Sequence, residues 1–305
     1  MSRVDLGGNG VGTADIMTDM TTTPRTREFR QVDVFGSDPF TGNPVAVVLD
    51  AEGLSDDQMR RFSVWSNLSE CTFVLPPTLP GADYRVRILS LEHELPFAGH
   101  PTLGTARAWI DAGGEPASPS TVVQECSIGL VRVRIDGDLL SFAAPPRQRT
   151  GPVDAELLAR VVDVLGVEPD AVVASEWLDN GPGWIGVLLE DDSAVLAVTP
   201  DAARDPGRWE IGVIGPTPPG SDVSFELRAF FSEGPTTLRE DPVTGSFNAA
   251  AAQWLLSSGR ADEQYVARQG TAIGRSGRIH VSADGDDVWI GGRTHVAVTG
   301  TTDLG

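Results

Sequence analysis

Three ionisable side chains in this sequence are suited to proton transfer: Glu70, His100 and Asp241. A carboxyl group that is buried beside apolar residues has its pKa raised toward neutrality, which is what a general acid or base requires. Histidine titrates near neutral pH and can pass a proton in either direction. If the fold brings these side chains together, they would move a proton rather than a hydride or a phosphoryl group.

Each of these residues also has an ordinary structural interpretation. Glu70 lies in NLSECTFVL, between an expected helix and an apolar strand, where it could be a surface carboxylate or a hydrogen-bonded cap. His100 could cap a helix or fill a core position, and Asp241 could cap a helix N-terminus. Ser246, in EDPVTGSFNAAAA, could be a simple first-turn hydroxyl.

An internal repeat gives two of these residues a shared context. When the chain is shifted by 141 residues, residues 86–108 lie over 227–249 without a gap, and His100 falls on Asp241. The identities are few, so a chance match is the alternative, but two such units indicate a pair of duplicated domains. We therefore predict that His100 and Asp241 are counterparts, each just before a helix N-terminus, and that they flank one cleft from opposite sides.

The same stretches predict a binding site for a carboxylate. Helix N-termini present free backbone amides and a partial positive charge, so they attract anions. The amides near Gly99, His100, Gly245 and Ser246 would hold the carboxylate of a small molecule and stabilise charge that develops beside it.

Composition excludes several classes of partner. The formal net charge is −20. A nucleic acid or an anionic membrane surface would be repelled by such a chain. The sequence also lacks a run of about 18 apolar residues, which a membrane-spanning helix requires. We expect neither a nucleic-acid nor a membrane partner.

The missing residue types exclude several cofactors. All 23 basic residues are Arg, so neither a pyridoxal-phosphate Schiff base nor a phosphate-binding GK[ST] loop can form. The two cysteines, Cys71 and Cys126, and the four histidines show no zinc-binding spacing. A racemase that uses two thiols needs one cysteine on each side of its cleft. The repeat places His100 and Asp241 at those two positions, so we do not expect this chemistry. We predict no cofactor, no metal, and free thiols in a reducing cytoplasm.

Periodicity and turn residues predict an α+β chain with two domains. Residues 1–28 lack apolar periodicity and are expected to form a disordered leader. The first domain is expected at 29–148 and the second at 149–301, with the last strands able to cross back to the first domain. The expected elements include strands at 29–35, 45–50 and 193–198, helices at 54–68 (with Ser55 as N-cap) and 101–114, and a helix ending near Leu256.

Five motifs together resemble the phenazine-biosynthesis PhzF-like family, which has the diaminopimelate-epimerase-like fold. They are VDVFGSDPFTGNPVAVVL, NLSECTFVL, ELPFAGHPTLGTA, EDPVTGSFNAAAA and RQGTAIGRSGRIHV. The resemblance covers about residues 29 to 301. It implies two pseudo-symmetric domains, each a mostly antiparallel sheet curled around a central helix, with the active site between them. Family members often form homodimers, and the best-known member isomerises a dihydro-hydroxyanthranilate without a cofactor.

The resemblance also implies roles for individual residues. Glu70 would be the proton-shuttling base, and the rest of the catalytic and substrate-binding set would be His100, Asp241, Ser246, Gly99 and Gly245. We therefore expect a cofactor-independent isomerase that acts on a small carboxylate, expected to be cyclic and unsaturated. An epimerase or racemase acting at one carbon, and a non-catalytic small-molecule binding protein, are the alternatives.

Overall fold

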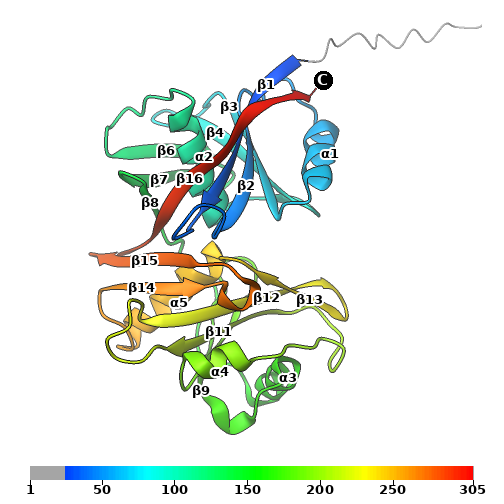
Figure 1. Cartoon of the computed structure of the whole chain (residues 1–305), viewed down its shortest axis with the longest axis vertical. Helices are drawn as coiled ribbons and strands as arrows, with labels where there is room; N and C mark the ends of the chain where they lie inside the picture. The colour runs from blue at the N-terminus through cyan, green and yellow to red at the C-terminus, as the bar shows by residue number, and fades with distance from the viewer. Residues whose placement is uncertain (1–24, 305) are drawn as a thin grey trace, which may run out of the picture.

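The computed structural model describes residues 25–304 and shows two halves stacked along the long axis of the molecule (Figure 1). The strands of the N-terminal half are β1 (Arg25–Val34), β2 (Asn43–Val48), β3 (Glu70–Leu75), β4 (Tyr84–Ser90), β5 (Glu94–Leu95), β6 (Thr121–Cys126), β7 (Gly129–Asp136) and β8 (Leu139–Ala143). Its helices are α1 (Asp56–Ser66) and α2 (Gly99–Asp111).

The C-terminal half contains the remaining elements. Its strands are β9 (Val172–Trp177), β10 (Ile185–Leu189), β11 (Glu210–Pro216), β12 (Phe225–Gly234), β13 (Thr237–Asp241), β14 (Gln264–Gln269) and β15 (Gly277–Asp284), and β16 (Asp287–Leu304) joins both halves. Its helices are α3 (Ala155–Leu165), α4 (Asp192–Ala197) and α5 (Gly245–Ser257), with short 3-10 helices η1 (Pro169–Ala171) and η2 (Thr271–Ile273). Within residues 25–304, no helix combines the length and apolarity that crossing a bilayer demands.

The sheet of the N-terminal half closes on itself around α2. Its strand order is β1-β2-β3-β4-β6-β7-β8-β16, and β16 also pairs with β1. Nine of the thirteen residues of α2 are buried. The helix can lie so close to the strands because it is rich in small residues: a Cβ on Gly104 would lie only 2.2 Å from Cγ1 of Val45. Helix α1 lies outside the sheet and begins after the predicted N-cap Ser55.

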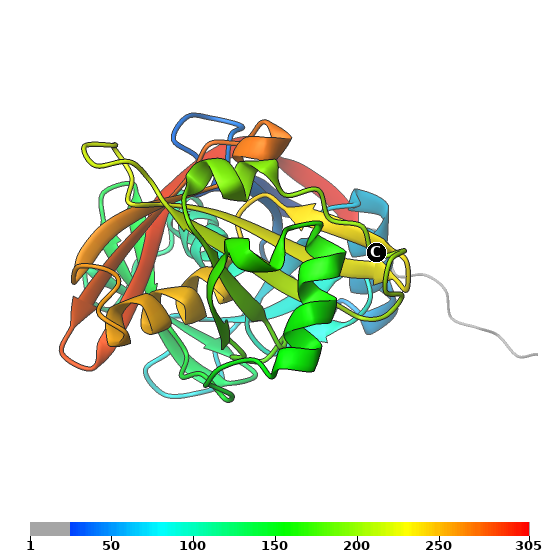
Figure 2. The same ribbon diagram turned by 90° about the horizontal axis from the view of Figure 1, so that it is seen from below.

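The sheet of the C-terminal half stays open. Its order is β16-β15-β14-β12-β11-β10-β9, so it ends at β9. The alanines of α5, residues 249–252, are all buried against this sheet. Helices α3 and α4 cover the outer face of the sheet, as the view from below shows (Figure 2), and enclose a second apolar cluster. Both sheets are mostly antiparallel, which confirms the predicted α+β class.

Strand structure begins earlier than we expected, so the boundary of the predicted leader is wrong. Residues 25–28 form the start of β1 and pair with residues 301–304 at the end of β16. The side chain of Arg27 is buried there and donates a hydrogen bond to the carbonyl of Glu52 at 3.0 Å. Residues 1–24 of the predicted leader lie outside the described residues.

The expected strand at 193–198 is also wrong, because this segment forms helix α4. Asp191 is the N-cap, and its side chain accepts a hydrogen bond from the backbone amide of Ala194 at 2.8 Å. Only Val195 of the helix is fully buried. A short apolar run cannot by itself distinguish a strand from a buried helical turn, and here the cap decides.

Candidate active site

The two central helices meet end to end where the halves join (Figure 1). Neither N-cap residue, Ala98 of α2 or Thr244 of α5, has a side chain that caps the helix. The first residues, Gly99 and Gly245, allow the close approach: a Cβ on Gly245 would lie 2.9 Å from Cα of Gly99 and 3.0 Å from the amide nitrogen of His100. Two helix N-termini therefore present their amides to the same place.

This meeting point corrects the repeat predicted from the sequence. Strands β4 and β12 do begin 141 residues apart, but α2 and α5 begin 146 residues apart and have the same length of thirteen residues. The β12–β13 hairpin is the longer one and carries the extra five residues. His100 therefore corresponds to Ser246, each the second residue of its helix, and Asp241 corresponds to Leu95 in the shorter hairpin.

Glu70 and His100 form the N-terminal side of the site. Oε2 of Glu70 lies 3.5 Å from Nε2 of His100, and both atoms are buried without a hydrogen-bond partner among the described residues. Burial raises the pKa of Glu70 to about 7 and lowers the pKa of His100 to about 4, because both charged forms lose their hydration. At neutral pH the carboxyl group is therefore close to half-ionised, and the imidazole is neutral.

Asp241 lies opposite, at the end of β13 rather than at a helix start. Its Oδ1 accepts a hydrogen bond from Nδ2 of Asn43 at 3.2 Å, and its Oδ2 accepts one from Oγ1 of Thr244 at 2.6 Å. Burial and the nearby charge of Glu70 raise the pKa of Asp241, while His100 opposes that rise. The fold thus brings together the three ionisable residues that the sequence singled out.

Ser246 lies in the first turn of α5, beside Gly245. Its hydroxyl oxygen accepts a hydrogen bond from the indole nitrogen of Trp184 at 2.9 Å, and its carbonyl accepts one from Nδ2 of Asn180 at 2.9 Å. Because the hydroxyl already accepts, its own hydrogen is available to donate to an anion.

A buried amide, Asn43, links the two sides and was missed from the sequence. Its Nδ2 lies 3.4 Å from Nδ1 of His100 and donates to Asp241 and, at 2.9 Å, to the carbonyl of Val243. Asn43 belongs to the TGNP segment, which local pattern marks only as a turn. TGNP lies within one of the five motifs that carry the family resemblance, and that resemblance was the only feature of the sequence that could have pointed to Asn43.

Gln269 is the second missed residue, and it holds the approach to α5. Its Oε1 accepts hydrogen bonds from the amide of Thr244 (3.1 Å) and from Nδ2 of Asn248 (2.7 Å). Its Nε2 donates to the carbonyl of Asp241 and to Oγ1 of Thr244, both at 3.0 Å. These bonds fix the backbone between Asp241 and the first turn of α5.

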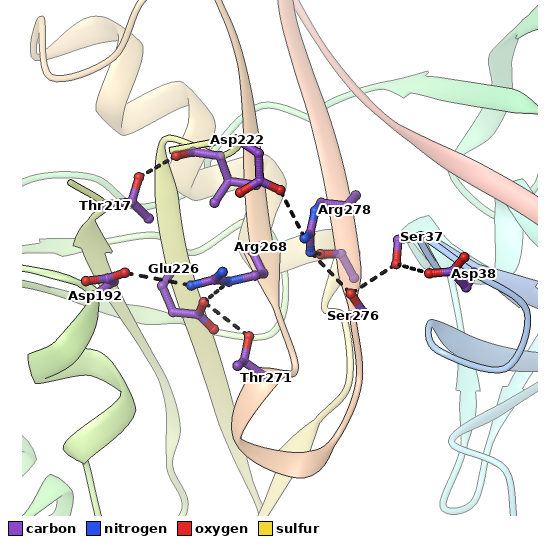
Figure 3. Close-up of polar contacts among 12 residues, drawn as sticks. Ser37, Asp38, Asp192, Thr217, Asp222, Glu226, Arg268, Thr271, Ser276 and Arg278 are labelled. Atoms are coloured by element: carbon purple, nitrogen blue, oxygen red, sulfur yellow. Dashed lines mark hydrogen bonds and ion pairs between the residues drawn. The ribbon is translucent and has the colours of Figure 1, made fainter. Parts of the chain in front are cut away.

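The segment around Gln269 is tied to the rest of the C-terminal half by an ion pair to a buried glutamate. Glu226 is fully buried and accepts hydrogen bonds from Arg268 and from Oγ1 of Thr271, and Arg268 also lies 3.7 Å from Asp192 (Figure 3). These contacts anchor the end of β14, which carries Gln269.

The same segment then crosses to the N-terminal half. Ser37 and Ser276 join through their hydroxyls at 3.0 Å (Figure 3) and through the Ser37 amide and the Ser276 carbonyl, also at 3.0 Å. The Ser276 amide donates to the carbonyl of Thr41 at 2.8 Å. Asp33 accepts hydrogen bonds from the amides of Thr41 and Gly42, which shapes the turn that leads into Asn43. The two halves are thus held in register next to the site.

Among the described residues, no group of three or more His, Cys, Asp or Glu side chains is arranged to bind a metal ion. Cys71 and Cys126 are buried and unpaired, and Sγ of Cys71 contacts Oγ of Ser66 at 3.1 Å.

Comparison with known proteins identifies one family and several similar sequences. A family model described as phenazine biosynthesis-like protein (PhzC-PhzF) matches residues 32–303. "Antisense-enhancing sequence 1" of Schizosaccharomyces pombe is 35% identical over 81% of this chain and 87% of its own length. An uncharacterized isomerase of Pseudomonas aeruginosa is 33% identical over 82% of this chain and 88% of its own length. The trans-2,3-dihydro-3-hydroxyanthranilate isomerase of the same species is 38% identical, over 56% of this chain and 60% of that enzyme.

Solved structures show the same fold. The PhzF-family protein of Enterococcus faecalis superimposes with a TM-score of 0.73 at 24% identity, covering 91% of this chain and 99% of that one. A predicted epimerase of Pseudomonas aeruginosa gives a TM-score of 0.74, also at 24% identity, covering 90% and 99%. With relatives named isomerases, the chain is an isomerase, as expected from its sequence. This chain belongs to the phenazine biosynthesis-like PhzC-PhzF family.

Proposed function

We propose that this protein is a cofactor-independent isomerase that moves a proton within a small carboxylate-bearing metabolite, expected to be cyclic and unsaturated. The observation that carries the proposal is the pair formed by Oε2 of Glu70 and Nε2 of His100, 3.5 Å apart, buried and without other partners among the described residues. Unpaired polar atoms are costly to bury, so they favour a site that a ligand completes.

Glu70 is the proton carrier in this proposal. With a pKa of about 7, its carboxylate can take a proton from a carbon acid, leaving the electron pair on the conjugated substrate, and its carboxyl group can return that proton to a second carbon as the double bond shifts. A carboxyl group with a pKa near the working pH serves both steps. His100 is neutral at this pH, so it assists by hydrogen bonding.

The two helix ends that meet between the halves would bind and polarise the substrate. In this proposal the amides at Gly99 and Gly245 and the hydroxyl of Ser246 would hold the carboxylate, and they would stabilise negative charge as the carbon is deprotonated. Asp241, fixed by Asn43 and Thr244, would face the substrate from the opposite side to Glu70.

The position of the double bond in the product tests this proposal directly. The first compound to test is trans-2,3-dihydro-3-hydroxyanthranilate, because a relative is named for acting on it. In deuterated water, NMR should show a shifted double bond, with deuterium at the new carbon wherever the Glu70 carboxyl group exchanges with solvent before it returns the proton. An epimerase would leave the double bond in place. The variant Glu70→Gln should lower turnover by about 10²–10⁴.

The matched control is Glu92→Gln, at an exposed glutamate of the same half. It should turn over at the wild-type rate. Normal turnover by Glu70→Gln would rule out the assigned proton carrier.

We also propose a homodimer, on the basis of the family resemblance. Light scattering should then give about twice the chain mass of 32.3 kDa, and a value equal to one chain mass would contradict it.

A further inference from the structure

Strand β13 carries a second charged residue on the same face as Asp241. In the β12–β13 pairing, Asp241 lies opposite Ala229 and Arg239 lies opposite Phe231. Side chains alternate along a strand, so residues 239 and 241 share a face. The apolar clusters agree with this assignment, because Ala229 and Phe231 pack in the cluster around the central helices.

The other face of the hairpin points away from the site. Leu238 packs in the outer cluster beneath α3 and α4, and Glu240 pairs with Arg228 at 2.8 Å. Arg239 therefore extends from the inner face, two residues before Asp241, which is about 7 Å along the strand. The two-residue strand β5 of the shorter β4–β5 hairpin does not extend to the corresponding position.

Arg239 is the cation that acts on the site. Its charge lowers the pKa of Glu70, against the larger effect of burial. Its own partner is Glu233, at 3.0 Å from Nη1, and both side chains are more than a third exposed. Such an exposed pair is weak, so a ligand anion can replace Glu233.

We propose that Arg239 is a specificity-determining residue that binds a second acidic group of the substrate. This inference rests on the proposed function, in which the first carboxylate lies at the N-termini of α2 and α5. Along the chain, Arg239 and Gly245 flank Asp241 on opposite sides. The substrate class is then a small ring with two acidic groups, one held by helix amides and one by the guanidinium, which suits carboxylates through its paired donors.

Two probes that differ by one carboxylate test the inference: benzoate and isophthalate, titrated calorimetrically into the full chain at low salt. The variant Arg239→Gln should weaken isophthalate binding about tenfold and leave benzoate binding unchanged, because one charge-assisted contact is lost. The matched control is Arg208→Gln, which removes the exposed cation of the Arg208–Glu210 pair (3.0 Å) and should affect neither probe. Glu233→Gln should strengthen isophthalate binding, because it removes the competing carboxylate.

The outcomes separate this inference from the proposed function. Equal weakening of both probes by Arg239→Gln would overturn it, because the guanidinium would then bind the only carboxylate or act by general attraction. Unchanged isophthalate binding would overturn it as well. Failure of the wild-type chain to bind benzoate would overturn the proposed function itself, and this inference with it.

Discussion

The two halves of the molecule are built around equal helices but differ in the strands that lead into them. Helices α2 and α5 have the same length, both begin with Gly and both lack a side-chain cap. The N-terminal sheet is closed and has a two-residue strand β5, whereas the C-terminal sheet is open and has a five-residue strand β13. Asp241 corresponds to Leu95 in the shorter hairpin, so only the C-terminal hairpin supplies a carboxyl group across from Glu70.

The two halves share the helix ends but differ in the ionisable residues that they contribute to the site. The equivalent positions, Gly99 with Gly245 and His100 with Ser246, build the shared helix-end surface. Glu70 and Asp241 do not occupy equivalent positions in the two halves, and they give the two sides of the site different acid–base behaviour. Glu70 Oε2 has no partner among the described residues, while both Asp241 oxygens accept hydrogen bonds. The predictions below act on this contrast, from the largest expected effect to the smallest.

The largest effect should come from replacing the unpartnered carboxyl group. Folding raises the pKa of Glu70 from 4.5 to about 7, so its burial costs stability once it ionises, increasingly as pH rises from about 4.5 through 7. Glu70→Gln should therefore gain less than 1 kcal/mol at pH 5 and about 3 kcal/mol at pH 8 over the wild type, from the size of that pKa change. Urea unfolding at both pH values measures this.

Asp241→Asn is the control on the opposite side. Folding also raises the pKa of Asp241 in the wild type. The amide of the variant would lose part of the hydrogen bonding with Asn43 and Thr244, so the gain in stability at pH 8 should be smaller than for Glu70→Gln. The contrast between the two sides fails if the two variants respond to pH identically.

The second effect concerns the contact between the helices. Gly245→Ala puts a methyl group against the backbone of Gly99 and His100, which cannot move aside easily, so we expect a loss of about 2 kcal/mol and of turnover. Gly234→Ala, where a Cβ would meet nothing within 4 Å, should leave both unchanged. Equal effects of the two variants would contradict the close packing.

The third effect compares a bond across the halves with one inside a half. Asn43→Ala removes the donor shared by Asp241 and Val243. It should lower the stability by about 1–2 kcal/mol and should also lower turnover. Asn180→Ala removes only the bond to the Ser246 carbonyl in its own half, so its turnover should fall less. Thermal unfolding and rate measurements distinguish these results, and a larger loss of turnover from Asn180→Ala would refute the linking role of Asn43.

The smallest effect should come from Ser246. Ser246→Ala leaves the Trp184 indole without its acceptor and should cost about 1 kcal/mol, measured by urea unfolding. Because Ser246 is assigned to binding, KM should rise more than kcat falls. Ser258→Ala, at the other end of α5, should change neither kinetic constant. A fall confined to kcat would move Ser246 into the proton-transfer step.

Much of the site could be predicted from residue types and motifs, but its internal correspondence could not. Glu70, His100, Asp241 and Ser246 lie together as the local patterns and the resemblance indicated. The gapless repeat paired His100 with Asp241, whereas the helices pair His100 with Ser246. A gapless comparison cannot detect that one hairpin is longer, because it applies a single offset of 141 residues where the offset changes to 146 within the hairpin.

The missed residues have a common cause. Asn43 and Gln269 are buried amides whose neighbours in sequence, TGNP and RQGT, indicate turns. Their partners lie far along the chain, and Asn43 lies 198 residues from Asp241. A side chain whose role depends on such distant partners leaves no local pattern. The same holds for residues 25–28, which become a strand only because the end of β16 pairs with them.

The sequence by itself determined the kinds of group available: a carboxyl after a helix, a histidine and a serine at helix starts, no lysine, and small residues that let a helix lie inside a sheet. Only the tertiary structure decided which groups face one another and how they titrate. The physical reason is that pKa depends on burial and on neighbours within a few ångströms. Those neighbours come from strand pairing and from the contact of two helix ends, which bring distant segments together.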